Sequence, residues 1–104
     1  MEKVLIIDDN ESLRYTLESV LEENGFASKS VEDGLKAIEE VRSKQYDLVI
    51  CDMKMPKMDG MQILAEVKKI DPDIPFIILT AFGDIKNAVE AMKQGASDYL
   101  TKPF

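Results

Sequence analysis

The sequence predicts an α/β fold, in which five parallel strands form one doubly wound sheet in the order 2-1-3-4-5. Three short apolar runs rich in β-branched residues, at positions 4–7, 48–51 and 76–79, have the composition of strands buried on both faces of a parallel sheet. Segments with apolar residues at helical spacing lie between these runs. Such alternation of strands and helices is typical of parallel sheets covered by helices.

The first half of the chain holds two predicted helices and a predicted edge strand. Asn24 and Gly25 predict the end of the first helix. The segment 27–31 is a polar strand, which favours the edge of the sheet. The apolar stripes are Leu13, Leu17, Val20 and Leu21 in the first helix, and Leu35, Ile38 and Val41 in the second.

The second half repeats the pattern. Asp59 is the predicted N-cap of the third helix, and Pro72 lies beyond its end. The fourth helix is predicted to end near Gly95, and the polar strand at 98–101 forms the other edge of the sheet. The stripes are Ile63, Leu64, Val67 and Ile70 in the third helix, and Ile85, Ala88, Val89 and Met92 in the fourth.

The composition predicts a single folded domain over residues 1–104, with 45% hydrophobic and 32% charged residues. A net charge of −7 argues against direct contact of this domain with nucleic acid or an anionic membrane. No apolar run reaches the roughly 18 residues that a membrane-spanning helix needs. One cysteine and no secretory signal favour the cytoplasm.

Polar side chains stand at the ends of the predicted strands. Asp8 and Asp9 follow the first strand, Asp52 ends the third, Thr80 the fourth and Lys102 the fifth. Because the strands are parallel, all five residues meet at the carboxyl edge of the sheet. Ligands of such sheets bind there, where the strand order reverses.

Three carboxylates in one crevice repel one another. At about 5 Å and an effective dielectric constant near 20, each pair costs roughly 3 kcal/mol. Either a carboxyl group is protonated, or a cation lies among them. Hard oxygen ligands favour Mg²⁺, with Mn²⁺ as an alternative. Together with an ammonium and a hydroxyl group, the site suits a phosphoryl group, and Asp52 would become an aspartyl phosphate.

Five motifs follow the strand ends in order: residues 7–10 (IDDN), 51–56 (CDMKMP), 58–60 (MDG), 79–81 (LTA) and 102–104 (KPF). Together they resemble the receiver domain of two-component response regulators, a variant of the flavodoxin-like fold. The match covers the whole chain. Residues 81–104 are similar to the NtrC-type transcriptional activators.

The resemblance implies a phosphoacceptor and a metal site. Asp52 matches the residue that takes the phosphoryl group and also binds the metal. Asp9 matches a direct Mg²⁺ ligand, and Asp8 an acidic partner that acts largely through water. The backbone carbonyl of Lys54 matches a further ligand, and the side chain of Lys54 lies at a position that modulates phosphate lifetime.

The resemblance also implies a switch. Thr80 matches the hydroxyl that turns toward the phosphoryl group, and Tyr99 the aromatic residue that changes exposure. Lys102 matches the phosphate-binding lysine, and Pro103 the proline of a cis peptide bond. Phe82 lies at a second position that modulates phosphate lifetime.

The phosphoryl donor must be external, because the chain has no histidine and no P-loop motif. The resemblance implies a sensor histidine kinase, a phosphotransfer protein or a small acyl phosphate. Such a domain catalyses only its own phosphorylation and dephosphorylation. Its surface around residues 84–104 would control an output domain, here one that regulates transcription.

Three alternatives remain. A phosphohydrolase of the haloacid-dehalogenase type also uses Asp, Mg²⁺, Thr and Lys, but Lys54 stands where that family has its general acid. A flavodoxin-like cofactor binder shares the topology, but no Ser/Thr-rich loop follows the first strand. An interaction module that acts without phosphorylation is the third.

The right-handed crossovers predict that the first helix covers one face of the sheet and the other three helices the opposite face. The family has a fifth helix after the Lys-Pro-Phe motif. The expectation is that the chain is truncated before this helix, or that a second subunit in a homodimer covers the same face.

Overall fold

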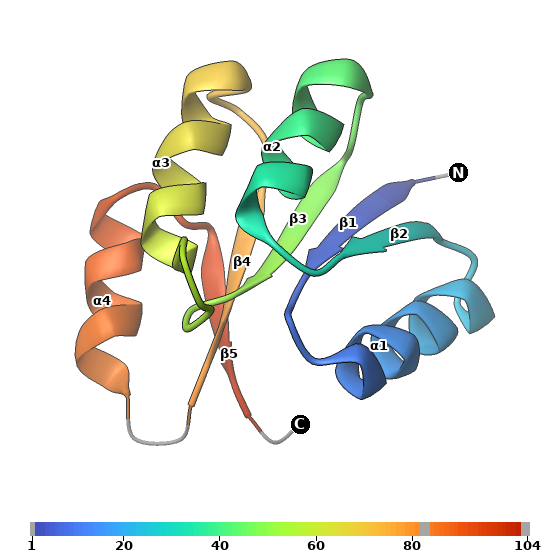
Figure 1. Ribbon diagram of the computed structural model, residues 1–104, viewed down its shortest axis with the longest axis horizontal. Coiled ribbons are helices and arrows are strands. Elements are labelled where there is room, and N and C mark those ends of the chain that lie inside the picture. Colours follow the sequence, from blue (N-terminus) through green and yellow to red (C-terminus); the bar gives the residue numbers. More distant parts are fainter. Residues whose placement is uncertain (1, 82–83, 103–104) are drawn as a thin grey trace.

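The computed structural model describes residues 2–81 and 84–102 and contains the nine predicted elements (Figure 1). In chain order they are β1 (Lys3–Ile7), α1 (Glu11–Glu23), β2 (Ala27–Val31), α2 (Gly34–Ser43), β3 (Leu48–Asp52), α3 (Gly60–Ile70), β4 (Phe76–Thr80), α4 (Ile85–Lys93) and β5 (Asp98–Thr101). All paired strands are parallel, in the order β2-β1-β3-β4-β5. The predicted fold class, strand order and two polar edge strands are confirmed.

Helix α1 lies on one face of the sheet, and α2, α3 and α4 lie on the other (Figure 1). The larger core cluster therefore fills the space beneath the three helices, where α3 contributes Ile63, Leu64 and Val67. The smaller cluster lies on the α1 face and contains four buried side chains, those of Val4, Ile6, Ile50 and Leu79. The predicted distribution of helices over the two faces is confirmed.

The predicted helix ends have clear local causes. The Asp59 side chain accepts a hydrogen bond from the backbone N–H of Gln62, and the Gln62 side chain accepts one from the Asp59 N–H, which completes a capping box. Gly25 and Gly95 follow α1 and α4 with φ of 87° and 111°, values that favour glycine.

Three predicted apolar stripes, those of α1, α2 and α4, differ from the buried helix faces. Leu35 of α2 is 73% exposed, and in α4 it is Ala88 and Ala91 that are fully buried. In α4, Ile85, Val89 and Met92 are exposed, as is Val20 of α1. Small alanine side chains let α4 pack closely on the sheet. The larger side chains beside them remain outside the contact between α4 and the sheet.

In the described part of the chain, no helix combines the length and the apolar character required to cross a membrane.

Candidate functional site

The predicted site residues meet at the carboxyl edge of the sheet. Asp8 and Asp9 follow β1 directly, and Asp52 is the last residue of β3. Strands β1 and β3 are neighbours, with Ile7 paired to Cys51. Asp8 and Asp52 therefore lie side by side where the strand order reverses, the position at which open α/β sheets bind ligands.

The three aspartates form a compact acidic cluster. One carboxylate oxygen from each of Asp8, Asp9 and Asp52 lies within 4.8 Å of the other two. Asp8 is fully buried and Asp52 is 8% exposed, whereas Asp9 is exposed to solvent. The cluster thus has two buried carboxylates and one that opens to water.

Lys102 supplies a positive charge to this cluster from the end of β5. Its Nζ donates hydrogen bonds to Asp52 Oδ1 at 3.0 Å and to Asp8 Oδ2 at 3.3 Å. These residues lie 50 and 94 positions away in the sequence. The ammonium group therefore partly offsets the repulsion between the two buried carboxylates.

Burial and charge shift the protonation equilibria at the site. The pKa of Asp52 is raised, chiefly because burial disfavours its charged form, with further increases from the charges of Asp8 and Asp9; the hydrogen bond from Lys102 opposes this rise. Burial lowers the pKa of Lys102, but its hydrogen bond to Asp52 and the nearby carboxylates raise it by more. Lys102 thus stays an ammonium group at neutral pH.

The donor set fits a hard divalent cation. Mg²⁺ and Ca²⁺ both prefer oxygen ligands, and carboxylates are among the most common of these in proteins. Two oxygen ligands on opposite sides of one Mg²⁺ lie about 4.2 Å apart. The carboxylate oxygens of the three aspartates lie within 4.8 Å of one another, a slightly larger distance. The spacing of the cluster is therefore compatible with Mg²⁺.

Thr80 is 2% exposed and ends β4, as predicted. Its hydroxyl group donates a 3.3 Å hydrogen bond to the backbone carbonyl of Asp84, just before α4. Lys54, on the loop after β3, is exposed, and its Nζ lies 3.9 Å from Asp84 Oδ2. Asp84 thus contacts two of the predicted site residues.

Tyr99 of β5 is half-buried and packs against the larger core cluster. The other two predicted positions, Phe82 and Pro103, lie outside the described residues. Cys51 is fully buried, and burial raises the pKa of its thiol well above the usual value. A thiol that is buried and held protonated in this way is inert.

The contacts of two further residues with Asp8 were not predicted. Arg14 of α1 donates a 2.7 Å hydrogen bond from Nη1 to the backbone carbonyl of Asp8. The N-cap residue Asn10 donates its backbone N–H to Asp8 Oδ1 at 2.9 Å. An available signal was the position of Arg14 one turn into a helix that directly follows two acidic residues.

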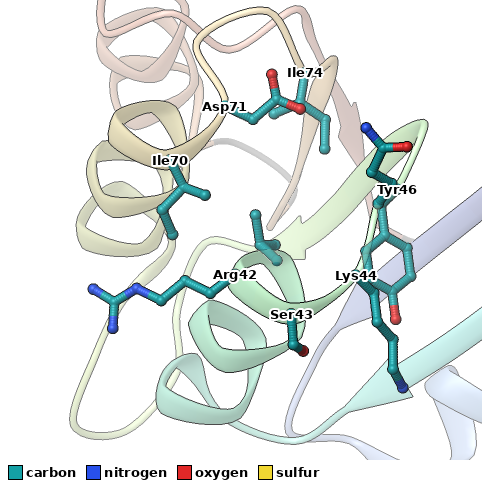
Figure 2. A pocket seen from close by; sticks show the side chains of 9 residues that line it. Arg42, Ser43, Lys44, Tyr46, Ile70, Asp71 and Ile74 are labelled. Carbon is teal, nitrogen blue, oxygen red and sulfur yellow. The ribbon is translucent and has the colours of Figure 1, made fainter.

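A hollow of about 280 Å³ lies at the opposite edge of the sheet, between the C-terminal ends of α2 and α3 (Figure 2). It contains none of the predicted site residues. Side chains of both charges line it, including Arg42, Lys44 and Asp71. It lies away from the acidic cluster and takes no part in the site.

Comparison with known proteins shows extensive similarity. A sequence profile of the response regulator receiver domain matches residues 4–104. The transcriptional regulatory protein ZraR of Klebsiella oxytoca is 44% identical over 101 residues, 97% of this chain and 23% of ZraR. The DNA-binding transcriptional regulator NtrC of Escherichia coli K12 is 42% identical over 101 residues, 97% of this chain and 22% of NtrC.

A solved structure gives the same result for the fold. A response regulator protein from Burkholderia pseudomallei, crystallised with a phosphorylated aspartic acid, a calcium ion and citrate, is 30% identical. The similarity covers all of this chain and 61% of that chain, with a TM-score of 0.92. This chain therefore spans less than a quarter of each of the two curated relatives and 61% of the solved one.

Proposed function

The chain belongs to the response regulator receiver domain family, and we propose that it is a phosphoacceptor switch in which Asp52 takes the phosphoryl group. It is thus a signalling domain rather than an enzyme that turns over a separate substrate. The observation that carries the proposal is the Asp52 carboxylate, which lies within the acidic cluster and accepts a hydrogen bond from Lys102.

The arrangement supports transfer to Asp52. A carboxylate oxygen of Asp52 forms a bond to phosphorus, while the bond from phosphorus to the donor breaks and the donor keeps that electron pair. Asp52 needs no general base, because it reacts as the carboxylate. Lys102 neutralises part of the negative charge. Mg²⁺, when bound, would be held by Asp9, Asp52, the Lys54 carbonyl and, through water, Asp8, and would supply further electrostatic stabilisation.

The switch begins at Thr80. In this structure its hydroxyl group is bonded to the Asp84 carbonyl. After phosphorylation the hydroxyl turns toward the phosphoryl oxygens, and this contact shifts the population toward a state with a different surface over α4 and β5. Tyr99 changes its exposure with this shift. Lys54 and Phe82 modulate the phosphate lifetime.

The partners follow from the family. The donor is a sensor histidine kinase, a phosphotransfer protein or a small acyl phosphate, because the chain itself has no histidine. ZraR and NtrC are described as transcriptional regulators, and this chain spans less than a quarter of each. An output domain that controls transcription in the cytoplasm is therefore the proposed target of the switch.

The test is incubation with acetyl phosphate and Mg²⁺, followed by intact-protein mass spectrometry. We expect the wild-type chain to gain the mass of one phosphoryl group, and we expect chelation of the metal to prevent the gain. Asp52→Asn should abolish the gain. Asp59→Asn is the matched control, because asparagine also caps a helix and Asp59 lies outside the acidic cluster.

Three results would contradict the proposal. An unchanged mass gain in Asp52→Asn would place the phosphoryl group elsewhere. Steady release of inorganic phosphate from small phosphate esters, without a phosphorylated intermediate on Asp52, would favour a phosphohydrolase. A wild-type chain that takes up no phosphoryl group at all would favour an interaction module.

A further inference from the structure

We propose that Arg14 is a positioning residue for the metal site, because it fixes the turn that presents Asp8 and Asp9. This inference rests on the proposed function of the acidic cluster. Arg14 lies in the first turn of α1 and is half-buried. Its Nη1 donates a 2.7 Å hydrogen bond to the Asp8 carbonyl, shorter than the hydrogen bonds to the Asp8 side chain.

The Asp8 carbonyl requires a partner at this point of the fold. Asp8 is fully buried, and its N–H donates to the Val31 carbonyl at 3.2 Å, which extends the pairing of β1 with β2 by one residue. The chain then leaves the sheet to enter α1. Because a buried carbonyl without a hydrogen bond is strongly disfavoured, the guanidinium group holds the backbone here.

Arg14 also closes a small network around the turn. Its backbone N–H donates to the Asn10 carbonyl at 3.0 Å, and the Asn10 N–H donates to Asp8 Oδ1 at 2.9 Å. The turn between β1 and α1 is thus held at its start by the Arg14 side chain and at its end by the Arg14 backbone. Asp9 lies within this turn.

Asp9 depends on this turn more than Asp8 does. The Asp8 carboxylate is held by Lys102 and by the Asn10 N–H. The Asp9 side chain is exposed, and within residues 2–81 and 84–102 its carboxylate has no hydrogen-bond or ion-pair partner. The position of Asp9 is therefore set by the backbone, and loss of the Arg14 contact should displace it from the cluster.

Charge alone predicts the opposite effect. The positive charge of Arg14 lies at this edge of the sheet: the pKa of the nearby Glu32 is lowered chiefly by its hydrogen bond with Lys36, and Arg14 makes a small further contribution. If Arg14 acted only through this charge, its removal would strengthen the binding of a divalent cation. Positioning predicts weaker binding, so the sign of the change separates the two roles.

The experiment is calorimetric titration of the unphosphorylated chain with Mg²⁺ alone. We expect Arg14→Met to weaken Mg²⁺ binding by about tenfold or more, a size typical of residues that orient metal ligands. Arg14→Lys keeps a donor and the charge and should restore part of the affinity. Arg42→Met is the matched control, since Arg42 is the only other arginine and lies at the opposite edge of the sheet.

The outcomes separate this inference from the proposed function. If the wild-type chain does not bind Mg²⁺, the proposed function fails and the inference with it. If the wild-type chain binds and Arg14→Met binds equally or more tightly, only the inference is overturned. Circular dichroism shows whether Arg14→Met folds. If it does not fold, Arg14→Gln replaces it, because the glutamine amide is too short to reach the Asp8 carbonyl. The same loss of Mg²⁺ affinity is expected.

Discussion

Individual residues at the site have opposite environments despite their shared chemistry. Asp8 and Asp9 are adjacent and carry the same group. Asp8 is buried and uses its N–H, its carbonyl and both carboxylate oxygens in hydrogen bonds, whereas Asp9 is exposed. Asp52 is also buried, and it shares the Lys102 ammonium group with Asp8. The structure therefore holds Asp8 in place and leaves Asp9 accessible to a cation from solvent.

The raised pKa of Asp52 predicts a pH-dependent effect of Asp52→Asn on stability. The folded chain holds the Asp52 proton more tightly than the unfolded chain, so the wild type loses stability as pH rises from about 4, the usual carboxyl range, through the folded pKa. Asn does not ionise. In the presence of chelator, Asp52→Asn and the wild type should have similar free energies of unfolding below that pH range. At neutral pH the free energy of unfolding of Asp52→Asn should be the higher of the two.

Urea denaturation across this pH range measures the effect, with Asp73→Asn at an exposed position as the control. A neutral-pH wild type that is more stable than Asp52→Asn would show that the ion pair with Lys102 outweighs the cost of burying the carboxylate.

Among the elements, α3 begins in close contact with the end of β3. A Cβ at Gly60, the first residue of α3, would lie 2.7 Å from the Asp52 carbonyl oxygen and 2.9 Å from Met53 Cα. The Gly60 N–H also donates to the Met53 carbonyl at 2.8 Å. The start of α3 is thus packed directly on the backbone of Asp52, the proposed phosphoacceptor.

This contact predicts that Gly60→Ala both destabilises the fold and slows phosphorylation. The added methyl group meets backbone atoms that cannot move without shifting Asp52, and overpacking of this kind costs about 1–3 kcal/mol. Gly34→Ala is a matched comparison at the start of α2. There the closest atom is the flexible Met58 side chain, at 2.6 Å, so a smaller loss is expected.

Chemical denaturation and the rate of phosphorylation by acetyl phosphate measure the two effects of Gly60→Ala. Equal stability and equal rates in both glycine variants would show that the end of β3 can adapt to an added side chain.

In the whole molecule, the parallel sheet joins residues that are distant in the sequence into one charged site. Lys102 reaches Asp8 across 94 positions because β5 and β1 end at the same edge. The site contains three carboxyl groups, those of Asp8, Asp9 and Asp52, and one ammonium group, that of Lys102. It therefore has excess negative charge. A metal ion that binds there stabilises the folded chain, since the unfolded chain does not assemble the site.

Mg²⁺ should therefore raise the melting temperature of the wild-type chain. At 100 times the dissociation constant the stabilisation is about 2.7 kcal/mol, which corresponds to an increase on the order of 10 °C for a domain of this size. Asp9→Ala should lose most of this increase. Without metal, the same variant should melt higher than the wild type, because one of three repelling carboxylates is gone.

Calorimetric melting with Mg²⁺ and with chelator measures both effects. A metal-free Asp9→Ala that melts lower than the metal-free wild type would mean that the repulsion within the acidic cluster is already compensated.

The sequence by itself determined the order of elements, the parallel sheet and the set of residues at its carboxyl edge. Strand composition, Asp59 as a cap and the glycines after the helices are local signals, and here these local signals agree with the tertiary fold. The motifs that follow the strand ends were sufficient to predict Asp8, Asp9, Asp52 and Lys102 as neighbours, because parallel strands end together.

Only the tertiary structure decided which apolar residues are buried and how the site is held. Periodicity did not reveal that α4 packs through Ala88 and Ala91 while Val89 stays exposed, because burial depends on how closely a helix approaches the sheet. The Arg14 contact with the Asp8 carbonyl was likewise not predicted. Every residue has a backbone carbonyl, so the sequence does not indicate which carbonyl needs a side-chain donor. That need arises only when the fold buries the carbonyl.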